Sequence, residues 1–244
     1  MTLEQLQILV ETVQQISLAR DLNKIIKVVR TSARKLTGAD GATFVLKDNG
    51  YCYYADEDAI SPLWKGQRFP LETCVSGWAM LNKKPAVIPD IYKDARIPVD
   101  AYRPTFVKSL AMVPIRSLDP IGSIGNYWAS YHEPTAEEIE LLQALANITA
   151  VSIENVYAYV ELQSQNEKLK EIAFLQAHQV RAPIANILGL SSLFNYNAPN
   201  DPVNAEVVNR MKSATETLDG IVKEIVQKTS RIQPGQDENQ ALAS

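Results

Sequence analysis

Residues 106–122 read FVKSLAMVPIRSLDPIG and carry the clearest signal of fold in this chain. The apolar run from Ser109 to Ile115 has the length of a buried β-strand. Asp119 and Pro120 follow as a turn signal. A second strand fits the residues from Ile121 to Ser130. This part of the chain therefore predicts two strands joined by a turn.

A second pair of strands is predicted upstream. Residues 42–46 and 51–54 favour β-structure, and Asn49-Gly50 lies between them. An Asn-Gly pair in that position is a strong hairpin signal, because both turn residues need a positive φ. A further strand fits residues 86–89.

Helical patterns frame these strands. Apolar residues recur at three- and four-residue steps up to about Leu36, and the pattern returns after Thr135. Thr135 and Glu138 fit a capping box at the start of that second helix. A short helix fits Leu71 to Leu81. The order helix, strands, short helix, strands, long helix predicts an α+β domain built on an antiparallel sheet.

Specific motifs lie on this framework: Gly77-Trp78, Pro89-Asp90-Ile91, Asp94-Ala95-Arg96, residues 106–122, and the closing helix from Glu137 to Asn155. Together they resemble a GAF domain, over residues 1–160. The resemblance implies a six-stranded sheet with a cleft over one face, often holding a small ligand. It also implies terminal helices that pair between subunits.

The ligand of such a cleft is unknown from the sequence. Candidate lining residues are one acidic and five aromatic side chains: Tyr53, Trp78, Asp90, Tyr92, Tyr102 and Trp128. The alternative is that the aromatic residues pack the core and its rim. Tetrapyrrole photoreceptors of this superfamily usually carry a cysteine followed by histidine, and neither Cys52 nor Cys74 has this neighbour. We therefore expect no covalent bilin, and the cysteines also lack the spacing of a disulfide framework or a metal site.

A different signal lies at residues 175–194, which read LQAHQVRAPIANILGLSSLF. His178 is one of two histidines, with Arg181 and Pro183 close behind. The segment resembles the phospho-acceptor helix of sensor histidine kinases. The resemblance implies a dimerisation and histidine-phosphotransfer hairpin over residues 175–232, two copies of which form a four-helix bundle. A neutral imidazole is a good nucleophile toward phosphorus.

The neighbours of His178 set expectations for this chemistry. Pro183 has no N–H for the carbonyl of Gln179, so we expect the helix to bend beside the histidine. The histidine-kinase family usually has Glu or Asp directly after the histidine, and this chain has Gln179. An amide cannot take a proton, so we expect inefficient autophosphorylation. The predicted catalytic set is His178 as phospho-acceptor with Gln179, Arg181 and Pro183.

The helical pattern after Thr135 meets no proline before Pro183, which suggests a coiled coil. Residues 161–174 are the predicted coiled-coil linker helix, and residues 233–244 a polar, disordered tail. Candidate seam residues lie at alternating three- and four-residue steps: Leu145, Ile148, Ser152, Asn155, Tyr159, Leu162, Asn166 and Leu169.

Composition narrows the possible partners. A net charge of −4 gives no general attraction to nucleic acid, and no apolar run approaches the ~20 residues of a membrane span. The amino terminus is unlike a signal peptide, so we expect a cytoplasmic protein. The residues after Ile232 are too few for an ATP-binding domain and no nucleotide motif lies elsewhere. We expect ATP chemistry only if another domain supplies it, whether the chain is an excerpt or a short natural form.

Two functional hypotheses follow. In the first, the chain is the sensor part of a two-component histidine kinase, with a GAF signal input coupled to phosphorylation of His178. In the second, it is a non-catalytic dimeric adaptor that docks a response regulator or another kinase. Expected partners are a second copy of the chain, a response-regulator receiver domain, a separate ATP-binding kinase domain and a small-molecule ligand of unknown identity.

Overall fold

The computed structural model describes residues 2–230, so the tail expected at residues 233–244 lies outside the described residues. The chain divides into two compact units, Met1–Glu161 and Leu162–Ser244. Among the described residues, no helix combines the length and apolar character needed to cross a bilayer.

Two helices open the first unit. Helix α1 spans Leu3–Ser17 and begins with a capping box between Thr2 and Gln5. Helix α2 spans Leu22–Thr37, and the side chain of Asp21 caps its first turn. It ends at Gly38, whose φ of 63° is the left-handed conformation that favours glycine at this position.

All strands of the sheet are antiparallel to their neighbours, in the order β3-β2-β1-β6-β5-β4. The strands are β1 (Gly41–Asp48), β2 (Tyr51–Ala59), β3 (Arg68–Pro70), β4 (Ala86–Ile88), β5 (Ser109–Ile115) and β6 (Gly122–Trp128). The predicted Asn49-Gly50 turn joins β1 to β2, with φ values of 47° and 85°. Each of the five predicted strands is present, and β3 is the additional one.

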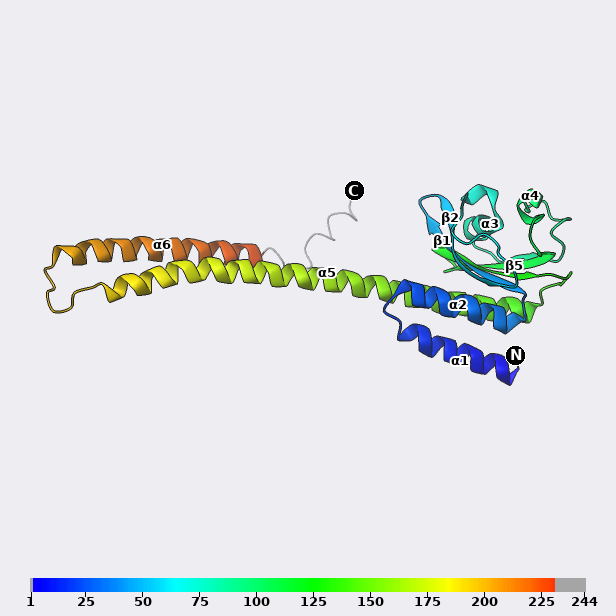
Figure 1. Cartoon of the computed structure of the whole chain (residues 1–244), viewed down its shortest axis with the longest axis horizontal. Helices are drawn as coiled ribbons and strands as arrows, with labels where there is room; N and C mark the ends of the chain where they lie inside the picture. The colour runs from blue at the N-terminus through cyan, green and yellow to red at the C-terminus, as the bar shows by residue number, and fades with distance from the viewer. Residues whose placement is uncertain (1, 231–244) are drawn as a thin grey trace, which may run out of the picture. The chain divides into compact units, whose positions relative to one another are not determined.

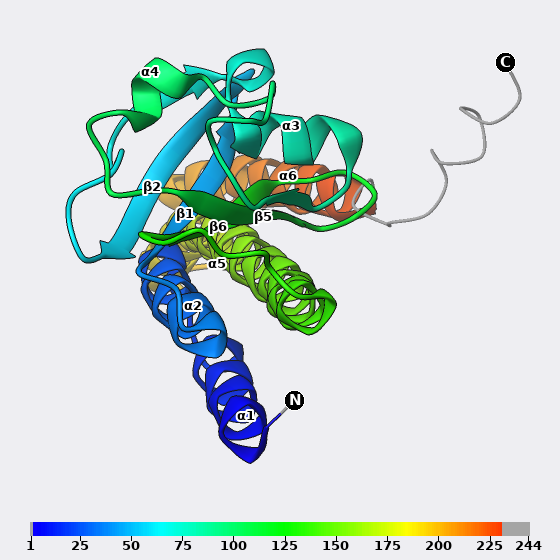
Figure 2. The ribbon, with the colours of Figure 1, turned by 90° about the vertical axis from the view of Figure 1, so that its right-hand side faces the viewer.

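Helices cover both faces of the sheet (Figure 2). Helix α2 and the first part of α5 (Ala136–Ser192) lie on one face, which we call the helix side, and α1 packs against α2 on that side. The other face, the cleft side, carries the 3-10 turn η1 (Leu71–Thr73), α3 (Val75–Asn82) and α4 (Val99–Tyr102). The predicted capping box is also present, with the hydroxyl of Thr135 accepting from the Glu138 amide.

Each face has its own hydrophobic core. Because side chains alternate across a strand, neighbouring residues of β6 enter different cores. Ile124 and Trp128 belong to the helix-side core, and Tyr127 belongs to the cleft-side core. A buried amide also lies on the helix side: Asn126 donates to the carbonyl of Ala33 at 2.8 Å and to the hydroxyl of Thr37 at 2.6 Å.

The helix-side core also contains part of the predicted coiled-coil seam. Leu145 is a member of this core, and Ser152 is buried within the same unit. The seam assignment is therefore wrong at these two positions. A helix that packs on a sheet repeats its apolar residues at three- and four-residue steps, as a coiled coil does, so the pattern alone does not separate them.

The second unit is a helical hairpin made of residues 162–192 of α5 and of α6 (Pro202–Ser230) (Figure 1). Asp201 caps α6, its carboxylate accepting from the Val203 amide at 3.0 Å. Asn204 is buried and holds the connecting loop, accepting from the Asn195 amide at 2.8 Å and donating to the Ala198 carbonyl at 3.1 Å. Helix α5 continues through Pro183, so the proline does not end it, and the expected bend stays a prediction.

Candidate functional site

The cleft side of the sheet contains a cavity of about 170 Å³. Its lining combines residues of β2, β3, α4 and the connecting segments: Tyr54, Trp64, Phe69, Thr73, Cys74, Pro98, Ala101 and Tyr102. Four of these residues are aromatic. The ring of Trp64 lies 4.7 Å from that of Tyr102 and 5.6 Å from those of Tyr54 and Tyr127. The remaining space is smaller than the ~300–1,000 Å³ typical of pockets for drug-sized ligands.

Two tyrosine hydroxyls of the cleft have partners. The hydroxyl of Tyr54 lies 2.8 Å from that of Ser76, and the hydroxyl of Tyr127 lies 2.9 Å from that of Thr43. Burial raises the pKa of Tyr54, Tyr102 and Tyr127, because a phenolate would lose its hydration there. The aromatic groups around the cavity are therefore neutral near pH 7.

Four of the six predicted ligand-binding residues lie on the cleft side or its outer surface. Tyr102 is buried and lines the cavity. Trp78 packs against the cleft-side core, with the guanidinium of Arg96 4.6 Å from its ring centroid. Asp90 accepts from the Tyr92 amide at 3.0 Å, and the ring of Tyr92 is 45% exposed. Asp90 is thus half-buried and Tyr92 is exposed, and neither is among the residues that line the cavity.

The other two predicted residues lie on the opposite face of the sheet. Trp128 packs in the helix-side core, and Tyr53 lines a different pocket. The expectation that the six residues share one cleft is therefore wrong for Tyr53 and Trp128. In each case the adjacent residue, Tyr54 or Tyr127, enters the cleft-side core instead. Strand alternation indicates that such neighbours face apart, but it does not say which of them faces the cleft.

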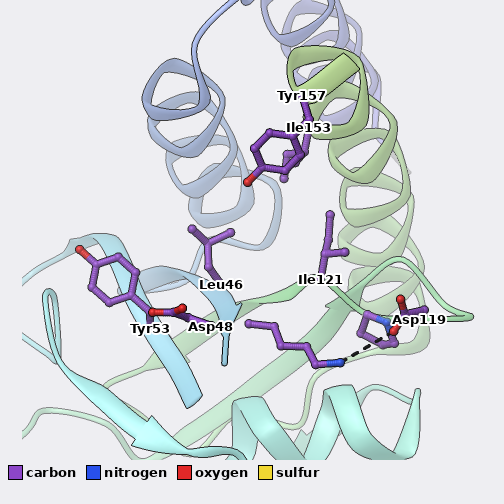
Figure 3. Close-up of a pocket in the computed structure, with 9 residues that line it drawn as sticks. Leu46, Asp48, Tyr53, Asp119, Ile121, Ile153 and Tyr157 are labelled. Atoms are coloured by element: carbon purple, nitrogen blue, oxygen red, sulfur yellow. Dashed lines mark ion pairs between the residues drawn. The ribbon is translucent and has the colours of Figure 1, made fainter. Parts of the chain in front are cut away.

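The pocket that contains Tyr53 lies on the helix side and has a volume of about 460 Å³ (Figure 3). Ile153 and Tyr157 of α5 face Leu46 of β1 across it. Its charged residues include Lys47, whose ammonium lies 3.8 Å from the carboxylate of Asp119. The pocket is therefore of mixed polarity, and its one lysine already has an acidic neighbour.

In the second unit, His178 lies on α5 with an exposed side chain, as do Gln179 and Arg181. Arg181 follows His178 by three residues, so the two share a helix face. Pro183 is buried. The catalytic roles assigned to these four residues stay predictions.

An apolar groove of about 570 Å³ runs beside this segment of α5. It is lined by residues of both helices of the hairpin: Gln176, Ala177, Val180, Arg181, Ile184 and Ile225. Arg181 is thus common to the groove and to the predicted catalytic set.

Comparison with known proteins identifies the family of the first unit. The family model for the GAF domain matches residues 19–154. The chain belongs to the GAF domain family. The match ends before His178, so it covers the sensor unit and not the hairpin. No curated protein matches the sequence.

Several solved structures share this fold. The GAF domain of a phosphoenolpyruvate-protein phosphotransferase from Acinetobacter is 16% identical, with a TM-score of 0.57, covering 66% of this chain and 99% of that one. The corresponding domain from Coxiella burnetii is 18% identical, with a TM-score of 0.57 and coverages of 64% and 96%. Free methionine-R-sulfoxide reductase from Neisseria meningitidis, in complex with its substrate, is 18% identical, with a TM-score of 0.56 and coverages of 64% and 91%. At these identities the likeness concerns the fold alone.

Proposed function

We propose that this GAF protein is the sensing and phospho-accepting part of a two-component histidine kinase. The observation that carries the proposal is an exposed His178 on the first helix of a helical hairpin that follows a GAF domain. Exposure is needed because the imidazole must align with the γ-phosphorus and the leaving oxygen of ATP. The ATP-binding domain is supplied from outside residues 1–244.

In this reaction the main task of the chain is to position the imidazole of His178 against the phosphoryl group. A ring nitrogen of His178 forms a bond to the γ-phosphorus, the bond to the bridging oxygen breaks, and ADP leaves. The other ring nitrogen carries the imidazole proton and gives it to a base, a role that Gln179 cannot fill. Arg181, on the same helix face, is suited to pair with the phosphoryl oxygens. The phosphoramidate then passes its phosphoryl group to an aspartate of a response-regulator receiver domain.

The surface of the hairpin supports a dimer. Large apolar side chains are exposed along both helices: Leu169, Ile172, Phe174, Ile184, Leu188, Val203, Val208, Val222 and Val226. Such a surface is unusual for a monomer. Two hairpins that bury these side chains against each other form a four-helix bundle. A second copy of the chain is therefore the partner that we propose for the groove at Ile184 and Ile225.

Signal transfer follows from the helix that the two units share. Helix α5 includes Leu145 of the helix-side core and His178 of the hairpin. A ligand changes the activity of His178 only if it binds one packing of the paired helices more tightly than the other. The cleft ligand and the direction of the switch are not part of this proposal.

The second candidate, a dimeric adaptor without phosphotransfer, is favoured by one observation. Gln179 takes the place of the usual acidic residue after the histidine. In the adaptor, the hairpin dimerises and docks a receiver domain or another kinase, and His178 is one surface residue among others.

Radiolabel transfer separates the two candidates. The chain is mixed with γ-labelled ATP and a separately expressed histidine-kinase ATP-binding domain. His178→Ala is the test variant, and His132→Ala is the matched control because it removes the other histidine. We expect acid-labile label on the wild type and on His132→Ala, and none on His178→Ala. Gln179→Glu should raise the labelling rate by about tenfold or more.

Absence of label with several donor domains contradicts the kinase proposal. Retention of a receiver domain on the immobilised chain, equal for wild type and His178→Ala, would then support the adaptor.

A further inference from the structure

The two cysteines of the sequence, far apart along the chain, meet in the cleft-side core. Cys52 lies on β2 and is fully buried, and Cys74 is the residue before α3. Both side chains belong to this one core, and each thiol is the largest influence on the pKa of the other. Neither is in a disulfide in this structure.

The local backbone holds Cys74 in place. Its sulfur caps α3, accepting from the Gly77 amide at 3.4 Å. Gly77 is required for this arrangement, because a β-carbon there would lie 1.8 Å from the carbonyl oxygen of Leu71. The close approach of η1 to α3 thus sets the position of the thiol beside Cys52.

The two thiols differ in acidity. The pKa of Cys74 is lowered, chiefly by a hydrogen bond from the side chain of Cys52, against the effect of burial and with help from backbone amides at the start of α3. The pKa of Cys52 is raised, chiefly by the same interaction and then by burial. Cys74, whose sulfur also accepts from the Gly77 amide at the start of α3, is therefore the better placed of the two thiols to react as a thiolate.

The two thiols also differ in access. Cys74 lines the 170 Å³ cavity, whereas Cys52 is not among the cavity's lining residues. A molecule of a few heavy atoms that enters the cavity meets Cys74 first. The rest of the lining is aromatic or uncharged, which suits a small neutral molecule.

We propose that Cys74 and Cys52 form a redox couple in the GAF cleft, in which a small hydroperoxide oxidises Cys74 and Cys52 then closes a disulfide. In the first step the Cys74 thiolate attacks one peroxide oxygen. An S–O bond forms, the O–O bond breaks, and the departing hydroxide takes a proton to become water. Cys74 is now a sulfenic acid.

In the second step the sulfur of Cys52 attacks the sulfur of Cys74. The S–S bond forms, the S–O bond breaks, and hydroxide leaves with the Cys52 proton as a second water. Hydrogen peroxide is thus reduced by two electrons to two waters, and the two thiols are oxidised to one disulfide. A dithiol reductant reverses the reaction by exchange.

The disulfide would join β2 directly to the start of α3. Because these elements carry Tyr54 and Cys74 of the cavity wall, the bond changes the cleft that we assign to signal input. The inference concerns the cleft alone and does not depend on phosphorylation of His178, so either proposal can fail without the other.

The test is intact-mass spectrometry of the whole chain after treatment with hydrogen peroxide and alkylation of free thiols under denaturing conditions. We expect the wild type to lose two hydrogens and to take up no alkyl group, and dithiothreitol to restore both reactive thiols. Cys52→Ser should stop at the sulfenic acid, which dimedone traps on Cys74. Cys74→Ser keeps a good helix cap, because serine accepts the same amide, and it should give no reversible product.

Three results would overturn the proposal. One is wild-type protein that keeps both thiols alkylatable after peroxide. Another is a disulfide that forms only between chains, seen as a dimer without reductant. The third is equal trapping by dimedone in Cys52→Ser and Cys74→Ser. Cys52→Ala serves in place of Cys52→Ser if circular dichroism shows that the hydroxyl unfolds the core.

Discussion

In the GAF unit, large apolar side chains from both faces of the sheet are buried within one chain, whereas the hairpin leaves most of its own exposed. Phe44, Ile124 and Tyr127 are fully buried in the first unit. In the described part of the hairpin, Val207 and Ala214 are buried, and Leu188 is 63% exposed. The difference indicates that the GAF unit completes its core alone, while the hairpin needs a partner surface.

We expect the strongest destabilisation from a change in the core of the GAF unit. Phe44→Ala should lower the free energy of unfolding of the GAF unit by about 3–5 kcal/mol, because it leaves a cavity where the ring packs. Urea unfolding followed by tryptophan fluorescence measures this. Leu188→Ala, the control in the hairpin, should change the same transition by less than about 0.5 kcal/mol. Similar effects for both variants would contradict the contrast between the units.

The second prediction concerns the hairpin, whose connecting loop is held by hydrogen bonds of Asn204. Asn204→Ala should destabilise the hairpin by about 2 kcal/mol, because it removes bonds to Asn195 and Ala198 and leaves their backbone groups without those partners. Hydrogen exchange of the hairpin amides reports the loss. Asn209→Ala changes an exposed asparagine of the same helix and should have little effect. A stable hairpin in Asn204→Ala would show that the loop does not contribute.

The third prediction concerns how dilution of the protein affects the stability of each unit. If two hairpins complete one core, each tenfold dilution should lower the stability of the hairpin dimer by about 1.4 kcal/mol, by mass action. The GAF unit should unfold at a denaturant concentration that does not depend on protein concentration. Sedimentation equilibrium of the wild type and of Ile184→Glu checks the dimer directly. Hairpin stability that is constant over a hundredfold dilution would contradict a second copy as the partner.

The smallest effect is the pH dependence of the GAF unit at Asp58. Partial burial alone would raise the pKa of this carboxyl, but hydrogen bonds from Thr31 and Arg34 outweigh it and lower the pKa. A lowered folded pKa gives stability that is present above the unfolded pKa, near 3.9, and is lost as pH falls through the folded value. We expect Asp58→Asn to lower the free energy of unfolding by about 1 kcal/mol at pH 7. Denaturant unfolding at a series of pH values should then show a smaller loss of stability at acid pH than in the wild type.

Much of the GAF fold could be predicted from local signals. The Asn49-Gly50 turn, the Asp119-Pro120 signal and the Thr135 capping box each act through the residues next to them, so the sequence alone placed β1, β2, β5, β6 and the start of α5. Strand β3 was missed because Arg68–Pro70 is short and contains a proline. Helix α4 was missed because a four-residue helix has no apolar period to detect.

The cleft was harder to predict, because its composition depends on which face each strand turns to the helices. The choice of Tyr53 over Tyr54, and of Trp128 over Tyr127, failed for this reason. The meeting of Cys52 with Cys74 depends on the pairing of β2 with β3 and on the close packing at Gly77, and no local pattern encodes it. On the hairpin, the resemblance to sensor histidine kinases singled out His178. The structure adds only that this side chain is exposed.

Strand β6 lies between β1 and β5, and its Asn126 donates two hydrogen bonds to α2. A slip of one residue would turn Asn126 toward the cleft and Tyr127 toward the helices. The amide would then lose the Ala33 carbonyl and the Thr37 hydroxyl, and the phenol would enter the apolar helix-side core. A misaligned sheet is thus destabilised on both of its faces. This increases the difference in free energy between the native state and the misfolded state most similar to it.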